Sequence, residues 1–145
     1  MARLAFQTAM RAAAVAFLDA YKTAASITLQ VYPARPRSIN PPTAFVDNIS
    51  EAIAYTALNQ RTVRVEMVVI HGLFDSKEAA DQRDAFVDGL IDYSLDNVHQ
   101  ADPTTTVAVV STTDEPAYVP DWLEPQYQRT YYATTITLEG LALTG

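Results

Sequence analysis

The chain has 145 residues, 49% of them hydrophobic and 19% charged, which is typical of a folded domain rather than a disordered chain. It contains no cysteine, so disulfides, thiolate metal sites and cysteine nucleophiles are excluded. The formal net charge of −7 argues against a DNA-binding module, because such modules need basic residues that neutralise phosphates. We therefore expect a single domain over residues 1–145 that does not bind DNA specifically.

The first predicted element is an amphipathic helix over residues 4–25. Its apolar residues recur with the period of a helix and would form one buried stripe. Charged residues interrupt the segment at Arg11, Asp19 and Lys22, so it contains no membrane-spanning run, and we expect no membrane partner. The predicted buried stripe comprises Phe6, Met10, Ala13, Ala14, Phe17, Leu18 and Tyr21.

A proline-rich arm is predicted between two strands. Residues 26–32 alternate apolar and polar side chains and read as a strand. Residues 33–42 contain four prolines, which forbid regular structure and favour an extended, semi-rigid arm. This arm carries Arg35 and Arg37, and a short strand is expected after it at residues 43–47.

The clearest predicted strand covers residues 61–71. One set of alternating residues is uniformly apolar, whereas the other is polar at first and apolar later. The apolar second half indicates that this end of the strand is covered on both faces. The preceding residues 51–58 read as a strand or a helical turn, and Ile53 and Tyr55 favour the strand, with a turn at residues 59–60.

A second helix is predicted from Asp75 to His99. Asp75 would be its N-cap, and Glu78 would complete a pattern similar to a capping box. Its hydrophobic residues again follow a helical period. The predicted buried stripe of this helix comprises Phe86, Val87, Leu90, Ile91, Leu95 and Val98.

The remainder of the chain is expected to be mostly β-structure. Strands are predicted at residues 104–112 and 129–138, with a turn at residues 113–116 and an irregular segment at residues 117–126. The order of elements predicts an α+β fold, with a mainly antiparallel sheet and two helices packed on one face.

The sequence lacks the usual signatures of catalysis. It has no nucleophile elbow and no glycine cluster that could hold a phosphate. The only histidines are His71 and His99. A metal pair of His71 with Asp75 is conceivable, but a histidine at a strand end and a helix cap are the more ordinary reading. We expect no catalytic residue, no metal, no cofactor and no enzymatic activity.

Five aspartates follow one face of the second predicted helix. They are Asp81, Asp84, Asp88, Asp92 and Asp96, at spacings of three or four residues. Like charges at this spacing destabilise a helix by roughly 0.2–0.5 kcal/mol per pair. The ordinary reading is a solvated face. The functional reading is an acidic wall that DNA passes, or a surface that meets arginines of a neighbouring subunit.

Candidate subunit-interface residues come from the arm and from the strands. Eight of the ten basic residues are arginines, which pair with interface carboxylates better than lysines do. Tyrosine is enriched at interfaces but is also common in sheets. The candidates are Arg35, Arg37, Phe45, Arg64 and Tyr131.

Nearly the whole chain resembles the tail terminator proteins of siphophages, especially those of actinobacterial hosts. The resemblance is one of fold pattern and arm rather than of a catalytic signature. The segments that carry it are residues 18–22 (LDAYK), 32–37 (YPARPR), 41–47 (PPTAFVD), 61–70 (RTVRVEMVVI), 79–81 (AAD) and 88–92 (DGLID).

The resemblance implies a homohexameric ring at the head-proximal end of the tail tube. Such a ring stops tube polymerisation and joins the tail to the neck, so the implied partners are further copies of the chain, the tail tube protein and a head–tail connector. DNA would pass through the lumen without specific binding. The implied location is the virion, after assembly in the host cytoplasm.

Three alternatives stay open at this stage. The nearest is a head–tail connector or stopper ring of the neck. A small-molecule-binding α+β domain would need a pocket with convergent polar groups and perturbed pKa values. An adaptor that binds peptides would need an uncovered edge strand.

Overall fold

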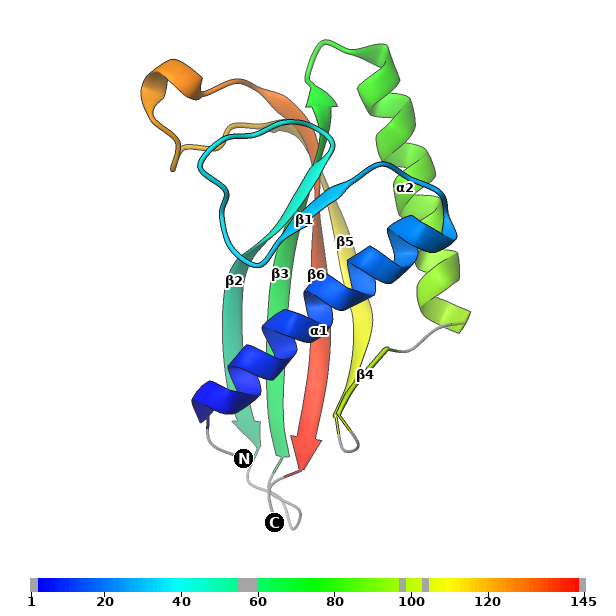
Figure 1. Ribbon diagram of the computed structural model, residues 1–145, viewed down its shortest axis with the longest axis vertical. Helices are drawn as coiled ribbons and strands as arrows, with labels where there is room; N and C mark the ends of the chain where they lie inside the picture. The colour runs from blue at the N-terminus through cyan, green and yellow to red at the C-terminus, as the bar shows by residue number, and fades with distance from the viewer. Residues whose placement is uncertain (1–2, 55–59, 97–98, 103–104, 144–145) are drawn as a thin grey trace.

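The predicted α+β architecture is confirmed by a computed structural model (Figure 1). The structure describes residues 3–54, 60–96, 99–102 and 105–143. Within these ranges, two helices and a mainly antiparallel sheet are present. The elements in chain order are α1 (Arg3–Ala24), β1 (Gln30–Tyr32), β2 (Thr43–Ala54), β3 (Gln60–Leu73), α2 (Lys77–Asp96), β4 (His99–Asp102), β5 (Thr105–Tyr118), the 3-10 turn η1 (Pro125–Tyr127) and β6 (Tyr131–Leu143).

The sheet has the strand order β1-β2-β3-β6-β5-β4. Only the short β1 runs parallel to its neighbour β2, and the other neighbouring strands are antiparallel. The last strand, β6, lies in the middle of the sheet between β3 and β5 (Figure 1). Strand β6 therefore joins β3, which is distant from it in the sequence, to β5.

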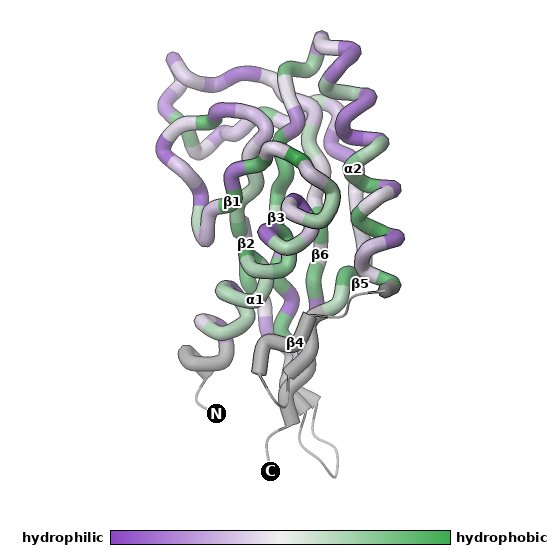
Figure 2. Tube along the Cα trace, turned by 45° about the vertical axis from the view of Figure 1, so that its right-hand side comes forward, coloured by the Kyte–Doolittle hydropathy of each residue, from purple (hydrophilic) through white to green (hydrophobic). Residues whose placement is uncertain are grey.

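Both helices cover the same face of the sheet, as predicted. Helix α1 crosses the strands diagonally, and α2 lies beside its C-terminal half (Figure 1). The alternating apolar residues of β3 point to this face and are fully buried. Hydrophobic residues concentrate along the strands, whereas α2 alternates hydrophilic and hydrophobic positions (Figure 2). The first core cluster includes Met10, Phe17, Leu18, Tyr21, Val63, Val65, Met67, Phe86, Leu90, Ile136 and Leu138.

A second, smaller core lies on the opposite face. Val68 and Ile70 of β3 pack there against Phe45, Tyr131 and Ala133. The arm and the segment after β5 cover this cluster through partly buried hydrophobic side chains. The expectation that the second half of β3 is covered on both faces is therefore confirmed, and the covering segments belong to the same chain. The covering side chains are Ile39, Tyr118 and Trp122.

Helix α1 ends one residue earlier than predicted, in a Schellman motif. The Ile27 amide donates to the Lys22 carbonyl at 2.9 Å, and the Ser26 amide donates to the Thr23 carbonyl at 3.3 Å. Ser26 takes the left-handed backbone conformation that this motif requires, with φ of 55°. The strand predicted from residue 26 is consequently shortened to β1, because residues 26–29 are used to reverse the chain.

The predicted boundaries of α2 were wrong at both ends. The N-cap is Ser76 rather than Asp75, because the Ser76 hydroxyl accepts a hydrogen bond from the Ala79 amide at 3.2 Å. The helix ends at Asp96, and His99 begins β4 instead of completing the helix. Asp75 remains exposed in the loop before the cap.

The predicted buried stripe of α2 was only half right. Phe86 and Leu90 are buried, but Ile91 is 43% exposed and Leu95 is 77% exposed. The side facing α1 is used instead, where the Tyr93 ring contacts the rings of Phe17 and Tyr21. Sequence period alone did not reveal that α1, as well as the sheet, packs against α2. Val98 lies outside the described residues.

Two strands run through breaks that the sequence predicted. Strand β2 runs without a break from Thr43 to Ala54, so the two short strands expected there are one. Residues 55–59, which include Asn59 of the predicted turn, lie outside the description, and Gln60 of that turn begins β3. Strand β5 continues through the expected turn at residues 113–116, because β6 supplies pairing partners along this region. Pro116 falls at a register shift of this pairing, where the ladder is irregular.

At Gly89, the side chain of Tyr21 from α1 lies directly against α2. A Cβ atom added there would lie 2.5 Å from the Tyr21 hydroxyl oxygen. That hydroxyl donates to the Phe86 carbonyl at 2.9 Å, and the Tyr21 ring is held between Phe86 and Tyr93. The ring therefore has no room to move away from an added methyl group.

We expect Gly89→Ala to destabilise the protein by about 1–3 kcal/mol, because the clash outweighs the gain of roughly 1 kcal/mol that alanine normally gives inside a helix. Urea unfolding would measure this. Tyr21→Phe removes the clashing oxygen, so the double variant should recover part of the loss. A stabilised Gly89→Ala would show that the helices do not approach this closely.

Candidate functional site

The arm at residues 33–42 is folded onto its own chain. The Arg35 Nε donates to Asp47 Oδ1 at 2.7 Å, and the Arg35 guanidinium lies 5.6 Å from the centre of the Trp122 ring. Arg11 also donates to the carbonyl of Pro33. The arm is thus a cover for the second core, and Arg35 already has a carboxylate and an aromatic partner. Arg37 is exposed beside a surface hollow that includes Trp122.

Two of the candidate interface residues are core residues. Phe45 is fully buried and meets the Trp122 ring edge-on, with 5.3 Å between the ring centres. Tyr131 is only 5% exposed and belongs to the same cluster. Neither side chain lies on the exposed surface of the chain. The sequence showed them as apolar strand residues but not which face the arm would cover.

Arg64 belongs to a polar, uncovered region that we call the open sheet face. Residues paired directly across neighbouring strands point to the same side, and Arg64 pairs with Ser50 and Glu139. Its Nε donates to Glu139 Oε2 at 3.0 Å. All its members are half-buried or exposed polar residues on the side away from the helices. The open sheet face comprises Asn48, Ser50, Thr62, Arg64, Glu66, Ser111, Thr113, Thr135, Thr137 and Glu139.

The aspartate stripe lies on the solvent side of α2. Asp81, Asp84, Asp88 and Asp92 are all exposed, and Asp84 accepts a hydrogen bond from the neighbouring Arg83 at 3.2 Å. Asp96 is the last residue of α2, and its side chain lies outside the description. Since α2 covers the helix side of the sheet, the stripe and the open sheet face point to opposite sides of the subunit.

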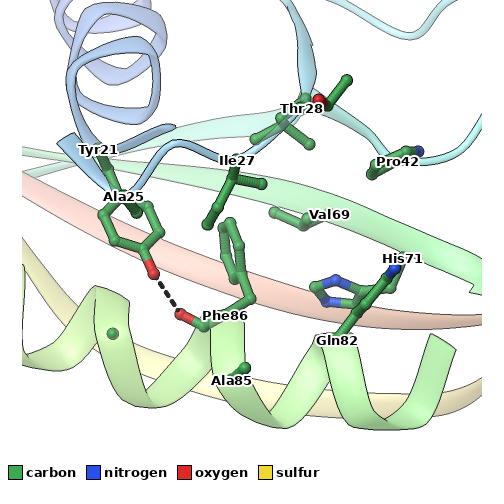
Figure 3. A pocket seen from close by; sticks show the side chains of 12 residues that line it. Tyr21, Ala25, Ile27, Thr28, Pro42, Val69, His71, Gln82, Ala85 and Phe86 are labelled. Carbon is green, nitrogen blue, oxygen red and sulfur yellow. Dashed lines mark hydrogen bonds between the residues drawn. The ribbon is translucent and has the colours of Figure 1, made fainter. Parts of the chain in front are cut away.

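A cavity lies between residues 21–29, Pro42, the end of β3 and α2 (Figure 3). It has a volume of about 600 Å³. Four separate segments build it, so no local sequence motif predicts it. Its lining has no charged side chain; apart from the backbone it offers only a few polar groups. The main lining residues are Ile27, Leu29, Val69, His71, Gln82 and Phe86.

His71 is a buried histidine at one end of this cavity. It is 5% exposed, and its Nε2 lies 3.1 Å from the hydroxyl oxygen of Thr134. Burial, and next the charge of Arg83, lowers the pKa of His71 to about 4, so the ring is neutral at neutral pH. Thr134 is fully buried, and a substrate therefore cannot reach its hydroxyl as a nucleophile.

A metal site at His71 and Asp75 is not formed. Asp75 is exposed in a loop while His71 faces the core. Within the described ranges, no group of three or more His, Cys, Asp or Glu side chains is placed to hold a metal ion. Also among the described residues, neither helix has the length and apolarity needed to cross a membrane.

No protein-family model matches the chain, and no curated protein matches it.

The titration of His71 predicts a pH dependence of stability. Its folded pKa lies below that of the unfolded chain, so the unfolded state binds more protons at acidic pH. Stability should be full above about pH 6.5 and fall by up to about 3 kcal/mol towards pH 4. Urea unfolding of His71→Gln and of the parent protein, at pH 7.5 and pH 4.5, would isolate this difference, because the carboxylates titrate in both. Equal pH dependence of the two proteins would contradict it.

The aspartate stripe predicts that removing one of its charges increases the stability of the protein in a salt-dependent way. Replacing Asp88 with asparagine removes its repulsion with Asp84 and Asp92, and should stabilise the protein by about 0.4–1 kcal/mol at low salt. In 1 M NaCl, where the Debye length is roughly 3 Å, the gain should vanish. Urea unfolding at the two salt concentrations would measure it. A loss of stability at low salt would mean that Asp88 has a favourable cationic partner within the subunit.

Proposed function

We propose that the protein is a structural virion subunit that forms a ring at the head-proximal end of a siphophage tail tube. The ring ends tube polymerisation and joins the tail to the neck. The observation that carries this proposal is the open sheet face: helices cover one side of the sheet, while half of the other side is uncovered and polar. A subunit whose sheet is covered by helices on one side and is hydrophilic on the other suits the wall of an aqueous channel.

The chemistry of the open sheet face supports the passage of DNA. Its one arginine, Arg64, is paired with Glu139, and Glu66 adds a second negative charge. The remaining members of the face are neutral hydroxyl and amide side chains. Such a wall neither holds phosphates nor carries a strong opposing field. The net charge of −7 per subunit points the same way.

The partners in this proposal are further copies of the chain, the tail tube protein and a head–tail connector, without cofactor or metal. We expect the purified protein to cap growing tail tubes and shorten them in proportion to its concentration. Electron microscopy of tubes polymerised with and without the protein would show rings at tube ends. Light scattering of the purified protein would give its mass alone and in the mixture.

One control variant and one alternative outcome separate this function from its rivals. Ala85→Leu narrows the large cavity but leaves the open sheet face untouched, so capping should continue. If that variant loses capping, the cavity is part of the function. A protein that ignores tube ends but binds the portal side of the neck would instead be a connector or stopper ring.

One observation favours a ligand-binding function as the second candidate. The cavity is large enough for a small molecule, and it contains a histidine with a strongly lowered pKa. Its uncharged lining would select a neutral, mostly apolar ligand. A monomer that leaves tubes unaffected, and whose Tm rises with such ligands but not in Ala85→Leu, would establish this candidate in place of the ring.

A further inference from the structure

The sheet ends in two strands that are only partly paired. On one side, β1 pairs with residues 43–45 of β2, and residues 46–54 have β3 as their only neighbouring strand among the described residues. On the other side, β4 covers residues 105–107 of β5 and leaves residues 108–118 bonded to β6 alone. Within the described part of the chain, each subunit therefore presents, at both edges of its sheet, a stretch of strand with no strand paired to its outer side.

The directions of the two edge strands are complementary. The pairs β2–β3, β3–β6 and β6–β5 are all antiparallel, so β2 and β5 run in opposite directions. A rotation about an axis along the strands preserves strand direction. It would bring β5 of one copy beside β2 of the next in the same antiparallel sense as the rest of the sheet. Since Asn48 lies level with Ser111 across the sheet, residues 48–54 meet residues 111–115 when neighbouring copies are staggered, as they are where strands are inclined to the axis of a barrel.

The shapes of the two edges also limit how they can pair. A register shift at Asp47 precedes the regular part of β2, residues 48–54. Shifts at Val110 and at Pro116 bound a regular segment of β5, residues 111–115. Bulges of this kind prevent unlimited edge-to-edge aggregation and leave one segment of about five residues, a common strand length. Val110, 50% exposed at its bulge, would gain cover from a neighbouring strand.

The side chains at the two segments fit side by side. On the open sheet face, Asn48 and Ser50 of β2 would meet Ser111 and Thr113 of β5, all of them small, polar and exposed. These four positions are uncharged, and the acidic residues of the two segments, Glu51, Asp114 and Glu115, lie at other positions. The contact joins two different surfaces of one chain, which is the heterologous type that generates closed rings.

We propose that residues 48–54 of β2 pair with residues 111–115 of β5 of a second copy, and that this strand pairing closes the ring. The inference rests on the proposed function and names the surface that performs it. The closed sheet places the open sheet face towards the lumen and both helices outside. The aspartate stripe of α2 then lies on the outer surface of the ring, away from the DNA path.

Disulfide trapping in the full chain tests this pairing, because the protein has no cysteine of its own. Within one subunit, β2 and β5 are separated by β3 and β6, three interstrand spacings of roughly 4.8 Å each. That distance exceeds the limit of about 7 Å between Cα atoms of a disulfide, so a disulfide between these strands must join two copies. The variants are Ser50→Cys with Ser111→Cys, and Ser50→Cys with Thr113→Cys.

We expect diamide oxidation of the assembled protein to give a ladder of covalent oligomers that stops at the ring size, for at least one of the two double variants. Each single-cysteine variant should remain uncrosslinked. The matched control combines Ser50→Cys with Thr137→Cys on the central strand β6, and it should give no ladder. Amide exchange at residues 48–54 and 111–115 of the unmodified protein should also slow when rings form.

Four results would overturn the pairing. Rings that cap tubes without a ladder or amide protection would refute the edge contact and leave the proposed function intact. Dimers from a single-cysteine variant would show a symmetric contact of like edges, and crosslinks to tube protein alone would show that the edge binds a different partner. A protein that neither forms rings nor caps tubes would refute the proposed function as well.

Discussion

The antiparallel pairing of β3 with β6 joins an early segment of the chain to the last one, and both hydrophobic clusters depend on it. On the helix side, Val65 lies beside Leu138 and Met67 beside Ile136, beneath α1 and α2. On the other side, Ile70 pairs with Ala133 beneath the arm and Trp122. The two strands thus contribute residues to the hydrophobic clusters on both faces of the sheet. Residues that weaken it act on both faces of the sheet at once.

The contact between the helices has a different character, because it combines close packing with one buried hydrogen bond. Gly89 allows the Tyr21 hydroxyl to reach the Phe86 carbonyl, and the Tyr93 ring closes the other side of Tyr21. The same arrangement holds α1 and α2 apart beyond this point and leaves the cavity beside His71. The placement of the helices therefore creates the cavity, whereas polar residues in the strands create the open sheet face.

Periodicity in the sequence predicted most of the fold. Alternation in residues 61–71 identified β3 and its double coverage, and the helical period identified both helices. The errors arose where tertiary contacts decide the outcome. Pairing with β6 extends β5 through a segment rich in turn residues, and Ser76 takes the capping role because its hydroxyl, not the Asp75 carboxylate, reaches the Ala79 amide. Leu95 looked buried by period but faces solvent.

The candidate site was less predictable than the fold. Phe45 and Tyr131 are buried by the arm, whose path the sequence does not reveal. Arg64 is exposed, and its role at a subunit interface stays a prediction. The cavity forms where four segments that are distant in the sequence meet.

The central position of β6 has one more consequence, for the order of events during synthesis. Until Tyr131–Leu143 has been synthesised, β3 and β5 each lack the strand that lies between them, and both hydrophobic clusters lack the residues that β6 contributes. A nascent chain accordingly has no finished sheet to offer another copy, so the order of synthesis itself delays self-association until the subunit is complete.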